Sequence, residues 1–306
     1  MQIIKPDTKI DFVGKRNIAV IISAVLILIG LASLVVKGGP NYGIDFAGGT
    51  LVQVLFEEGT DATAIKGSLE GLDLGSMSVQ QFGDNDNEFL IRVENSSGEL
   101  KGLSKQISDA LQTQYGVGNV DIRRVEMVGP QVGKDLRSKG IKAIFYAMLG
   151  ILVYISWRFE FRFAVGAIIA LIHDVVITLG VFSLFGKEID LPIIAAFLAI
   201  IGYSLNDTII VYDRIRENVA KYNKESFSFI VNRSINDTLS RTLLTSGTTL
   251  LVVLSLFVLG GGVIHNFAFA MLVGVLIGTY SSIFVASPLL IFWEQHKAAK
   301  LVAHPE

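Results

Sequence analysis

The fold class is decided by one stretch of the sequence, Leu191-Pro-Ile-Ile-Ala-Ala-Phe-Leu-Ala-Ile-Ile-Gly-Tyr-Ser-Leu-Asn-Asp207-Thr-Ile-Ile-Val-Tyr212. It is long and apolar enough to cross the hydrocarbon core of a bilayer as one helix. It nevertheless contains Asp207, and a carboxylate at the centre of a membrane helix costs roughly 2.5–3.5 kcal/mol. Chains that keep such a group commonly use it for ion passage or for pairing with another helix. The stretch therefore predicts a membrane protein and a candidate functional residue.

The composition also indicates a membrane protein. The 306 residues are 51% hydrophobic with a mean hydropathy of +0.54, which is too apolar for an ordinary soluble domain. A net charge of −2 gives no electrostatic basis for binding nucleic acid. The absence of cysteine excludes disulfides and thiolate ligands, and four scattered histidines indicate no metal site. No nucleotide-binding loop and no nucleophile–base pair stands out, so we expect neither a cofactor nor an enzyme.

Five further apolar stretches bring the predicted transmembrane helices to six. The six are residues 18–36, 141–157, 163–185, 191–212, 243–259 and 267–292. The first resembles a signal peptide in its preceding basic residues. Its apolar run is longer than a signal core and has no convincing A-x-A cleavage site, which favours an uncleaved anchor. We therefore expect a polytopic α-helical protein in which residues 141–293 form a five-helix bundle.

The basic residues predict the orientation of these spans, because Lys and Arg concentrate in cytoplasmic loops. They lie mainly in the N-terminal segment, the 158–162 turn, the 214–241 loop and the C-terminal tail. The short loops on the other side, 186–190 and 260–266, contain only Lys187. We expect both termini, residues 1–17 and 294–306, to be cytoplasmic.

Residues 37–140 separate the first two spans and are expected to form a small periplasmic domain. This segment contains ten Lys and Arg residues and fifteen Asp and Glu residues, so its net charge is −5. Alternating apolar residues predict four strands and amphipathic segments predict two helices, in the ferredoxin-like order β-α-β-β-α-β. The strands are expected at 50–56, 78–82, 88–93 and 120–127, and the helices at 61–72 and 99–115. Glycines at 38–39, 43 and 48–49 are expected to form turns where the domain leaves the first span.

Five segments in order along the chain resemble a known family. They are 42–50 (YGIDFAGGT), 128–133 (VGPQVG), 170–174 (ALIHD), 202–218 (GYSLNDTIIVYDRIREN) and 240–249 (SRTLLTSGTT). Together they are similar to the SecF family, the smaller subunits of the SecD–SecF protein-export complex in the resistance-nodulation-division (RND) superfamily. The resemblance covers nearly the whole chain.

The resemblance implies more than the residues alone predict. It implies half of a twelve-span unit, paired with SecD in the bacterial inner membrane and associated with the SecYEG channel. It further implies that the proton-motive force helps to draw preproteins outward. Asp207 and Arg241 match family positions in the ion pathway, to which SecD would add an aspartate.

Asp207 itself has two readings. It either pairs with a partner helix for assembly or acts as a protonatable carrier. Arg241 is the candidate counter-charge, although an arginine at the start of a span more commonly snorkels to the membrane surface. Asn206 is expected to hold the carboxylate by a hydrogen bond. Tyr203 and Ser204 lie on the same helix face and could supply a polar lining.

His173 and Asp174 lie near the middle of the third span. They either form an inter-helix hydrogen bond or act as a relay or conformational latch. Two ionisable groups at that depth raise the free energy of the folded protein, which favours the functional interpretation.

Other polar residues have weaker functional readings. The hydroxyls of Thr245, Ser246 and Thr248 either line a wet path or permit close helix packing. Asp213, six residues beyond Asp207, points away from it and is read mainly as a solvated charge at the membrane surface.

Three functions remain open at this stage. The chain is an ion-driven export subunit whose outer domain transiently holds emerging polypeptide, an RND-type exporter of small molecules or lipids, or a structural scaffold of the translocon. The outer domain is small for a drug-binding vestibule, which disfavours the second. Protons and sodium ions are both possible drivers, because each needs a carboxylate.

Overall fold

The computed structural model describes residues 9–72, 74–75, 77–82, 87–93, 100–260 and 262–303. Within them, six helical stretches are long and apolar enough to cross a membrane, which confirms the predicted number. Five are α1 (Arg16–Val36), α5 (Pro130–Arg158), α6 (Phe161–Leu184), α7 (Leu191–Lys221) and α8 (Phe227–Leu259). The sixth runs through α9 (Gly262–Ser281), the π-helical turn η1 (Ser282–Ala286) and α10 (Ser287–Ala303).

Three of these helices are much longer than the apolar stretches that predicted them. α5 begins at Pro130 instead of 141, α7 continues to Lys221, and α8 begins at Phe227 instead of 243. Hydropathy marks only the part of a helix that meets hydrocarbon, whereas backbone hydrogen bonding continues past the membrane surface. The additional turns contain most of the charged residues of these helices.

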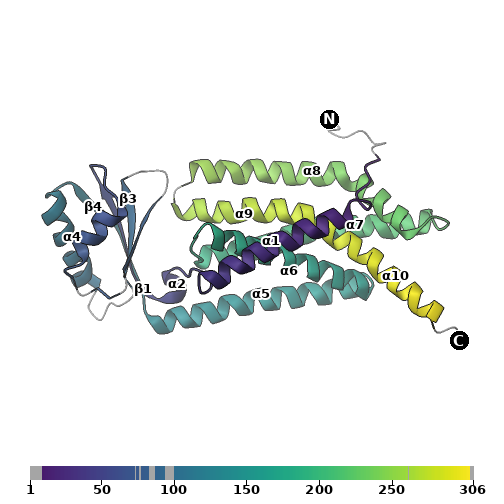
Figure 1. Ribbon diagram of the computed structural model, residues 1–306, viewed down its shortest axis with the longest axis horizontal. Coiled ribbons are helices and arrows are strands. Elements are labelled where there is room, and N and C mark those ends of the chain that lie inside the picture. Colours follow the sequence, from purple (N-terminus) through teal and green to yellow (C-terminus); the bar gives the residue numbers. More distant parts are fainter. Residues whose placement is uncertain are drawn as a thin grey trace.

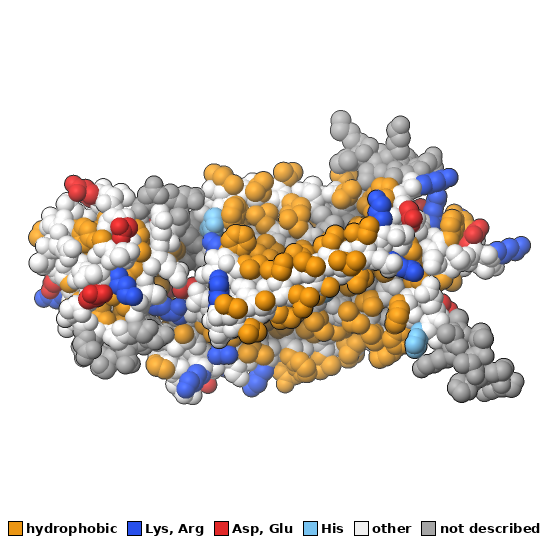
Figure 2. Space-filling view, viewed as in Figure 1, with side chains coloured by type: hydrophobic (Ala, Val, Ile, Leu, Met, Phe, Trp, Pro, Cys, Tyr) orange, Lys and Arg blue, Asp and Glu red, His pale blue; other side chains and the backbone are white. Residues whose placement is uncertain are grey.

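The bundle has two distinct ends. The small sheet domain lies at one end, and α1 begins and α10 ends at the other (Figure 1). Hydrophobic side chains form a broad band over the middle, while charged side chains concentrate at both ends (Figure 2). Large apolar side chains of the bundle, such as Ile18, Leu28 and Phe145, are each at least 60% exposed. Such a surface is stable only against lipid or partner helices.

The sheet domain has the predicted ferredoxin-like topology. Its elements are β1 (Gly49–Phe56), α3 (Ala62–Leu69), β2 (Met77–Gln81), β3 (Glu88–Val93), α4 (Leu100–Tyr115) and β4 (Val120–Val128). The strand order is β2-β3-β1-β4, and all three pairings are antiparallel. The predicted hairpin turn falls mostly on residues 83–86, outside the described residues.

The core of this domain lies on one face of its sheet. Val52, Val54 and Ile91 alternate toward α3 and α4, where they meet side chains such as Ile65 and Ile107. All of these side chains are fully buried. Period-two alternation puts the intervening strand residues on the other face, which neither α3 nor α4 covers. That open face turns toward the helix bundle (Figure 1).

Glycine turns connect the domain to the bundle, as predicted. Gly38 and Gly39 follow α1 with φ of +75° and +124°, while Gly48 precedes β1 and Gly49 begins it, with φ of +79° and +117°. L-residues rarely adopt these conformations. A Cβ on Gly48 would also lie 2.9 Å from the Cα of Pro130, where α5 begins. Between the pairs lies a short helix that the sequence did not predict, α2 (Ile44–Ala47).

The domain is docked onto the loop between α6 and α7. The Ile189 N–H donates to the Asn41 carbonyl at 2.7 Å, and the Gly43 N–H donates to the Ile189 carbonyl at 2.8 Å. Arg92 of β3 donates to the Glu188 carboxylate at 3.2 Å and also to the carbonyl of Tyr42. The docking therefore combines a short main-chain ladder with one mostly buried ion pair.

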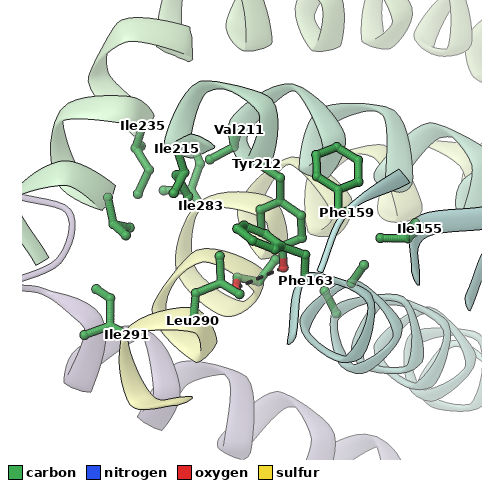
Figure 3. Close-up of a cluster of buried hydrophobic side chains, with 14 of the residues drawn as sticks. Ile155, Phe159, Phe163, Val211, Tyr212, Ile215, Ile235, Ile283, Leu290 and Ile291 are labelled. Atoms are coloured by element: carbon green, nitrogen blue, oxygen red, sulfur yellow. Dashed lines mark hydrogen bonds between the residues drawn. The ribbon is translucent and has the colours of Figure 1, made fainter. Parts of the chain in front are cut away.

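An apolar layer fills the bundle near the end where α1 begins (Figure 3). Tyr212 is fully buried there, with the rings of Phe159 and Phe163 packed at centroid distances of 6.5 and 5.0 Å. Its hydroxyl donates to the carbonyl of Ala286 at 3.2 Å. Because Tyr212 lies about 7.5 Å along α7 from Asp207, this layer separates that carboxylate from the end of the bundle.

Candidate functional site

Asp207 faces the helices that pack on α7 and is fully buried. Its Oδ2 accepts a hydrogen bond from Ser246 of α8 at 3.3 Å, and Ser246 shares a second bond of 2.7 Å with Thr279 of α9. Among the described residues, nothing donates to its Oδ1, which is also buried. A buried acceptor without a donor is costly. This oxygen is therefore able to take up a proton or a cation.

Arg241 lies at nearly the same depth as Asp207. Asp207 is about 24 Å along α7 from Leu191, and Arg241 is about 27 Å along α8 from Leu259. Arg241 is close enough to act on Asp207 through its charge. It is exposed, however, and none of the ion pairs found between described residues includes it. The two groups are thus neighbours without contact.

The other polar residues near Asp207 are arranged differently from expectation. Asn206 is exposed and makes no hydrogen bond to the Asp207 carboxylate, because adjacent residues point about 100° apart on a helix. The hydroxyls of Thr245 and Thr248 donate to carbonyls of their own helix at 2.9 Å. The Tyr203 hydroxyl is buried with no partner in the described part of the chain.

His173 and Asp174 lie at the centre of a second, fully bonded cluster. His173 Nδ1 is 2.9 Å from Asp174 Oδ1, and its Nε2 is 3.0 Å from the Ser23 hydroxyl of α1. Asp174 Oδ2 accepts from Ser204 of α7 at 2.5 Å and from Ser281 of α9 at 2.8 Å. Four helices therefore meet at this pair.

The two clusters share their helices. Ser204 lies one turn before Asp207 on α7, and Thr279 and Ser281 lie on the same stretch of α9. A Cβ on Gly278 would lie 2.9 Å from the Cβ of Ser204, so α7 and α9 touch here. The sequence interpretation missed Ser23 and the α9 residues. The hydroxyl-rich run 279–282 (TYSS) inside an apolar span was the available signal.

Asp213 lies outside both clusters. Its carboxylate is 41% exposed and pairs loosely with Arg158 at 3.5 Å and Arg216 at 3.6 Å. This is the environment of a solvated charge at the membrane surface. Among the described residues, no three His, Asp or Glu side chains come together as a metal site would need.

The end of α7 nearest the sheet domain carries a third group of carboxylates. Asp190 caps this helix by accepting from the Ile193 N–H at 3.1 Å, and Asp45 accepts from the Leu191 N–H at 2.9 Å. Burial raises the pKa of Asp190 to about 6, with a further contribution from the charges of Asp45 and Glu188. Burial also raises the pKa of Glu188, which Arg92 partly offsets. The docking contact is therefore sensitive to charge.

Comparisons with known proteins agree with this architecture. Residues 107–296 match the family described as protein export membrane protein SecD/SecF, C-terminal, and residues 32–59 match the SecD/SecF GG motif. The chain is 50% identical to a protein translocase subunit SecF of Magnetococcus marinus, covering 99% of this chain and 98% of that one. A SecF of Escherichia coli O157:H7 is 44% identical over 86% and 82% of the two chains.

A solved structure has the same fold. The crystal structure of SecDF from Thermus thermophilus, described as a translocon-associated membrane protein, superposes with a TM-score of 0.85 at 35% identity. The match covers 96% of this chain and 40% of the SecDF chain, so the chain spans less than half of that protein.

Proposed function

The chain belongs to the SecD/SecF family of protein-export membrane proteins, and we propose that it is the ion-binding subunit that powers export of preproteins. Its curated relatives are named protein translocase subunits, which makes it a transport subunit of Sec export and not an enzyme. We propose the bacterial inner membrane as its location, with both termini cytoplasmic. The concentration of Lys and Arg in the N-terminal segment, the 158–162 turn, the 214–241 loop and the C-terminal tail supports this orientation.

SecD is the proposed partner, since the matching family is described as SecD/SecF and the matching solved structure is named SecDF. The surface of α7 and α8 supports this. Asn206 and Arg241 are exposed there at the depth of the hydrocarbon core, where lipid would leave them unsatisfied. A partner subunit with polar groups would satisfy both and complete the ion path. SecYEG and the preprotein are proposed as further partners.

One observation carries the proposal: Asp207 is fully buried, yet no described residue donates a hydrogen bond to one of its oxygens. A carboxylate kept only for structure would be fully bonded, as Asp174 is. Uptake of a proton or cation by Asp207 neutralises the charge that attracts Arg241. The relative energies of two arrangements of α7 and α8 then change, which is what coupling requires.

The sheet domain supplies a surface for the polypeptide. β2 and β4 are edge strands, and an extended chain can add to such an edge by main-chain hydrogen bonds. We propose that emerging polypeptide is held transiently there, while movement of the docked domain is driven from the bundle.

The test is preprotein export in vesicles that contain SecYEG and the complex of this chain with SecD. Proton and sodium gradients are imposed separately, each at the same electrical potential. One gradient should stimulate export. Equal export with either gradient, or with none, would favour a scaffold. Gradient-driven loss of small amphiphiles from the vesicles without any effect on export would favour an RND-type exporter.

A further inference from the structure

The hydrogen bonds around His173 form a chain with a fixed direction. It starts at the ring nitrogen Nε2, passes through Ser23 at 3.0 Å and Tyr280 at 3.0 Å, and ends at the Ala19 carbonyl at 2.7 Å. A carbonyl only accepts, so the Tyr280 hydroxyl donates its single proton to Ala19. Ser23 must then donate to Tyr280, and it accepts from His173. Every one of these contacts carries a hydrogen only if Nε2 bears one.

The other ring nitrogen points at a carboxylate. His173 Nδ1 lies 2.9 Å from Asp174 Oδ1, and the second oxygen of Asp174 already accepts from Ser204 and Ser281. A proton is therefore also required between Nδ1 and Oδ1, and it lies on Nδ1 because imidazole is the stronger base of the two. With both nitrogens bonded through hydrogen, the pair holds one proton more than a neutral imidazole beside a carboxylate. The extra proton makes the pair neutral overall, and a neutral pair has the lower free energy in a membrane interior.

We infer that His173 and Asp174 form a second proton-binding site, which fastens α1 to the bundle while it is loaded. Loss of the Nε2 proton would leave a nitrogen that only accepts. Ser23 would satisfy it by turning its hydroxyl away from Tyr280, and the chain of bonds from α6 to α1 and α9 would break. Because α1 leads into the sheet domain through Gly38 and Gly39, its release would reach the outer domain. This last step rests on the function proposed above.

The surroundings limit what else could set this charge. His173 is 7% exposed, toward a groove of about 520 Å³ between α1, α6 and α10, in which Arg16 is the other ionisable lining residue. The Tyr280 ring stacks on the His173 ring, with the two ring centroids 6.1 Å apart. Asp207 is the charged residue of α7 nearest along the helix to Ser204, one turn away. Asp174 is thus the direct counter-charge.

The test is ¹⁵N NMR of histidine-labelled complex with SecD in lipid, with the spectrum of the His173→Gln complex subtracted to isolate His173. The wild type at pH 7 should show a ring protonated on both nitrogens. Asp174→Asn should convert it to a neutral ring, and Asp207→Asn should leave it protonated. Hydrogen exchange of α1 amides should rise in Asp174→Asn and Ser23→Ala.

A neutral His173 ring in the wild type would overturn the inference. So would loss of the doubly protonated signal in Asp207→Asn, since the pair would then not be a separate site. Neither result depends on export, so failure here is distinguishable from failure of the proposed function.

Discussion

At the residue scale, the two buried carboxylates of the bundle differ in how their oxygens are satisfied. Asp174 receives three hydrogen bonds from side chains on two other helices and its own. Asp207 receives one long bond, from a serine that has Thr279 as a second partner. The first is built into the packing, while the second is left available for a ligand.

Truncation of the two carboxylates should therefore affect stability differently. Asp174→Ala leaves Ser204 and the His173 ring without their acceptor, whereas Ser281 keeps the Gly278 carbonyl. Each orphaned buried group costs about 1–3 kcal/mol. We expect a loss of at least about 2 kcal/mol in the free energy of unfolding of the complex. Asp207→Ala should cost less than about 1 kcal/mol. Denaturant unfolding of the purified complexes measures both, and equal losses would contradict this assignment.

Sequence patterns located Asp207, His173 and Asp174, because an ionisable residue in an apolar span is conspicuous. They could not say which oxygen is bonded, since the donors Ser246, Ser204 and Ser281 come from helices distant in sequence. The expected Asn206 contact was wrong for a local reason. Its side chain points to a different face of α7, so adjacency in sequence gave no adjacency in space.

At the element scale, helix pairs are held by close backbone contacts as well as polar groups. α1 meets α6 where Gly30 and Gly180 face each other, and a Cβ on Gly30 would lie 2.8 Å from the Gly180 Cα. One turn further on, the hydroxyls of Ser33 and Ser183 are 2.8 Å apart. Small residues with hydroxyls are the usual means of packing helices in lipid.

Gly30→Val should separate these two helices. The added carbons meet backbone, which cannot rotate away, so we expect a loss of about 1–3 kcal/mol in the free energy of unfolding. Gly150→Val on α5 is the matched control, because a Cβ there meets nothing within 4 Å. The same stability in both variants would mean that the α1–α6 contact is not tight.

Asp190 should make the N-terminal end of α7 sensitive to pH. Its pKa is raised to about 6, so the folded state favours the protonated form. The resulting stabilisation of the folded state is complete below about pH 4 and is lost as the pH rises through about 6. Asp190→Asn keeps the cap and stays neutral. The free energy of unfolding of Asp190→Asn should therefore increase relative to that of the wild type between pH 4 and 8, by at most about 3 kcal/mol. Thermal unfolding across this range measures it, and a constant difference would contradict the shift.

Strand and helix positions in the sheet domain were predictable because alternation and amphipathic periods are local signals. All six elements were predicted to within three residues at each end. The start of α5, the end of α7 and the start of α8 were not predicted, since hydropathy falls where hydrocarbon ends and not where the helix ends. α2 and η1 were missed because a single turn leaves no periodic pattern.

At the scale of the whole molecule, the sheet domain and the bundle communicate through a small docking contact. Among the described residues, Arg92–Glu188 is the one ion pair of this contact, and both side chains are less than 20% exposed. A double-mutant cycle with Arg92→Gln and Glu188→Gln should give a coupling of about 1–3 kcal/mol. Hydrogen exchange of the Gly43 and Ile189 amides reports the undocking.

The exposed pair Arg123–Asp121, on β4 of the same domain, is the matched control for that cycle. Exposed pairs are worth about 0.2–1 kcal/mol, and this one is not part of the docking contact. Coupling as weak in the docking pair as in the control would mean that the domain is held by its main-chain ladder alone.

The most direct test of the account is gradient-driven export by the complex with Asp207→Asn, compared with Asp213→Asn. Asparagine keeps the shape of the side chain and cannot bind a proton. We predict that Asp207→Asn leaves assembly with SecD intact and abolishes the stimulation by the ion gradient, while Asp213→Asn retains it. Stimulation that persists in an assembled Asp207→Asn complex would contradict the assignment of Asp207 as the site that drives export.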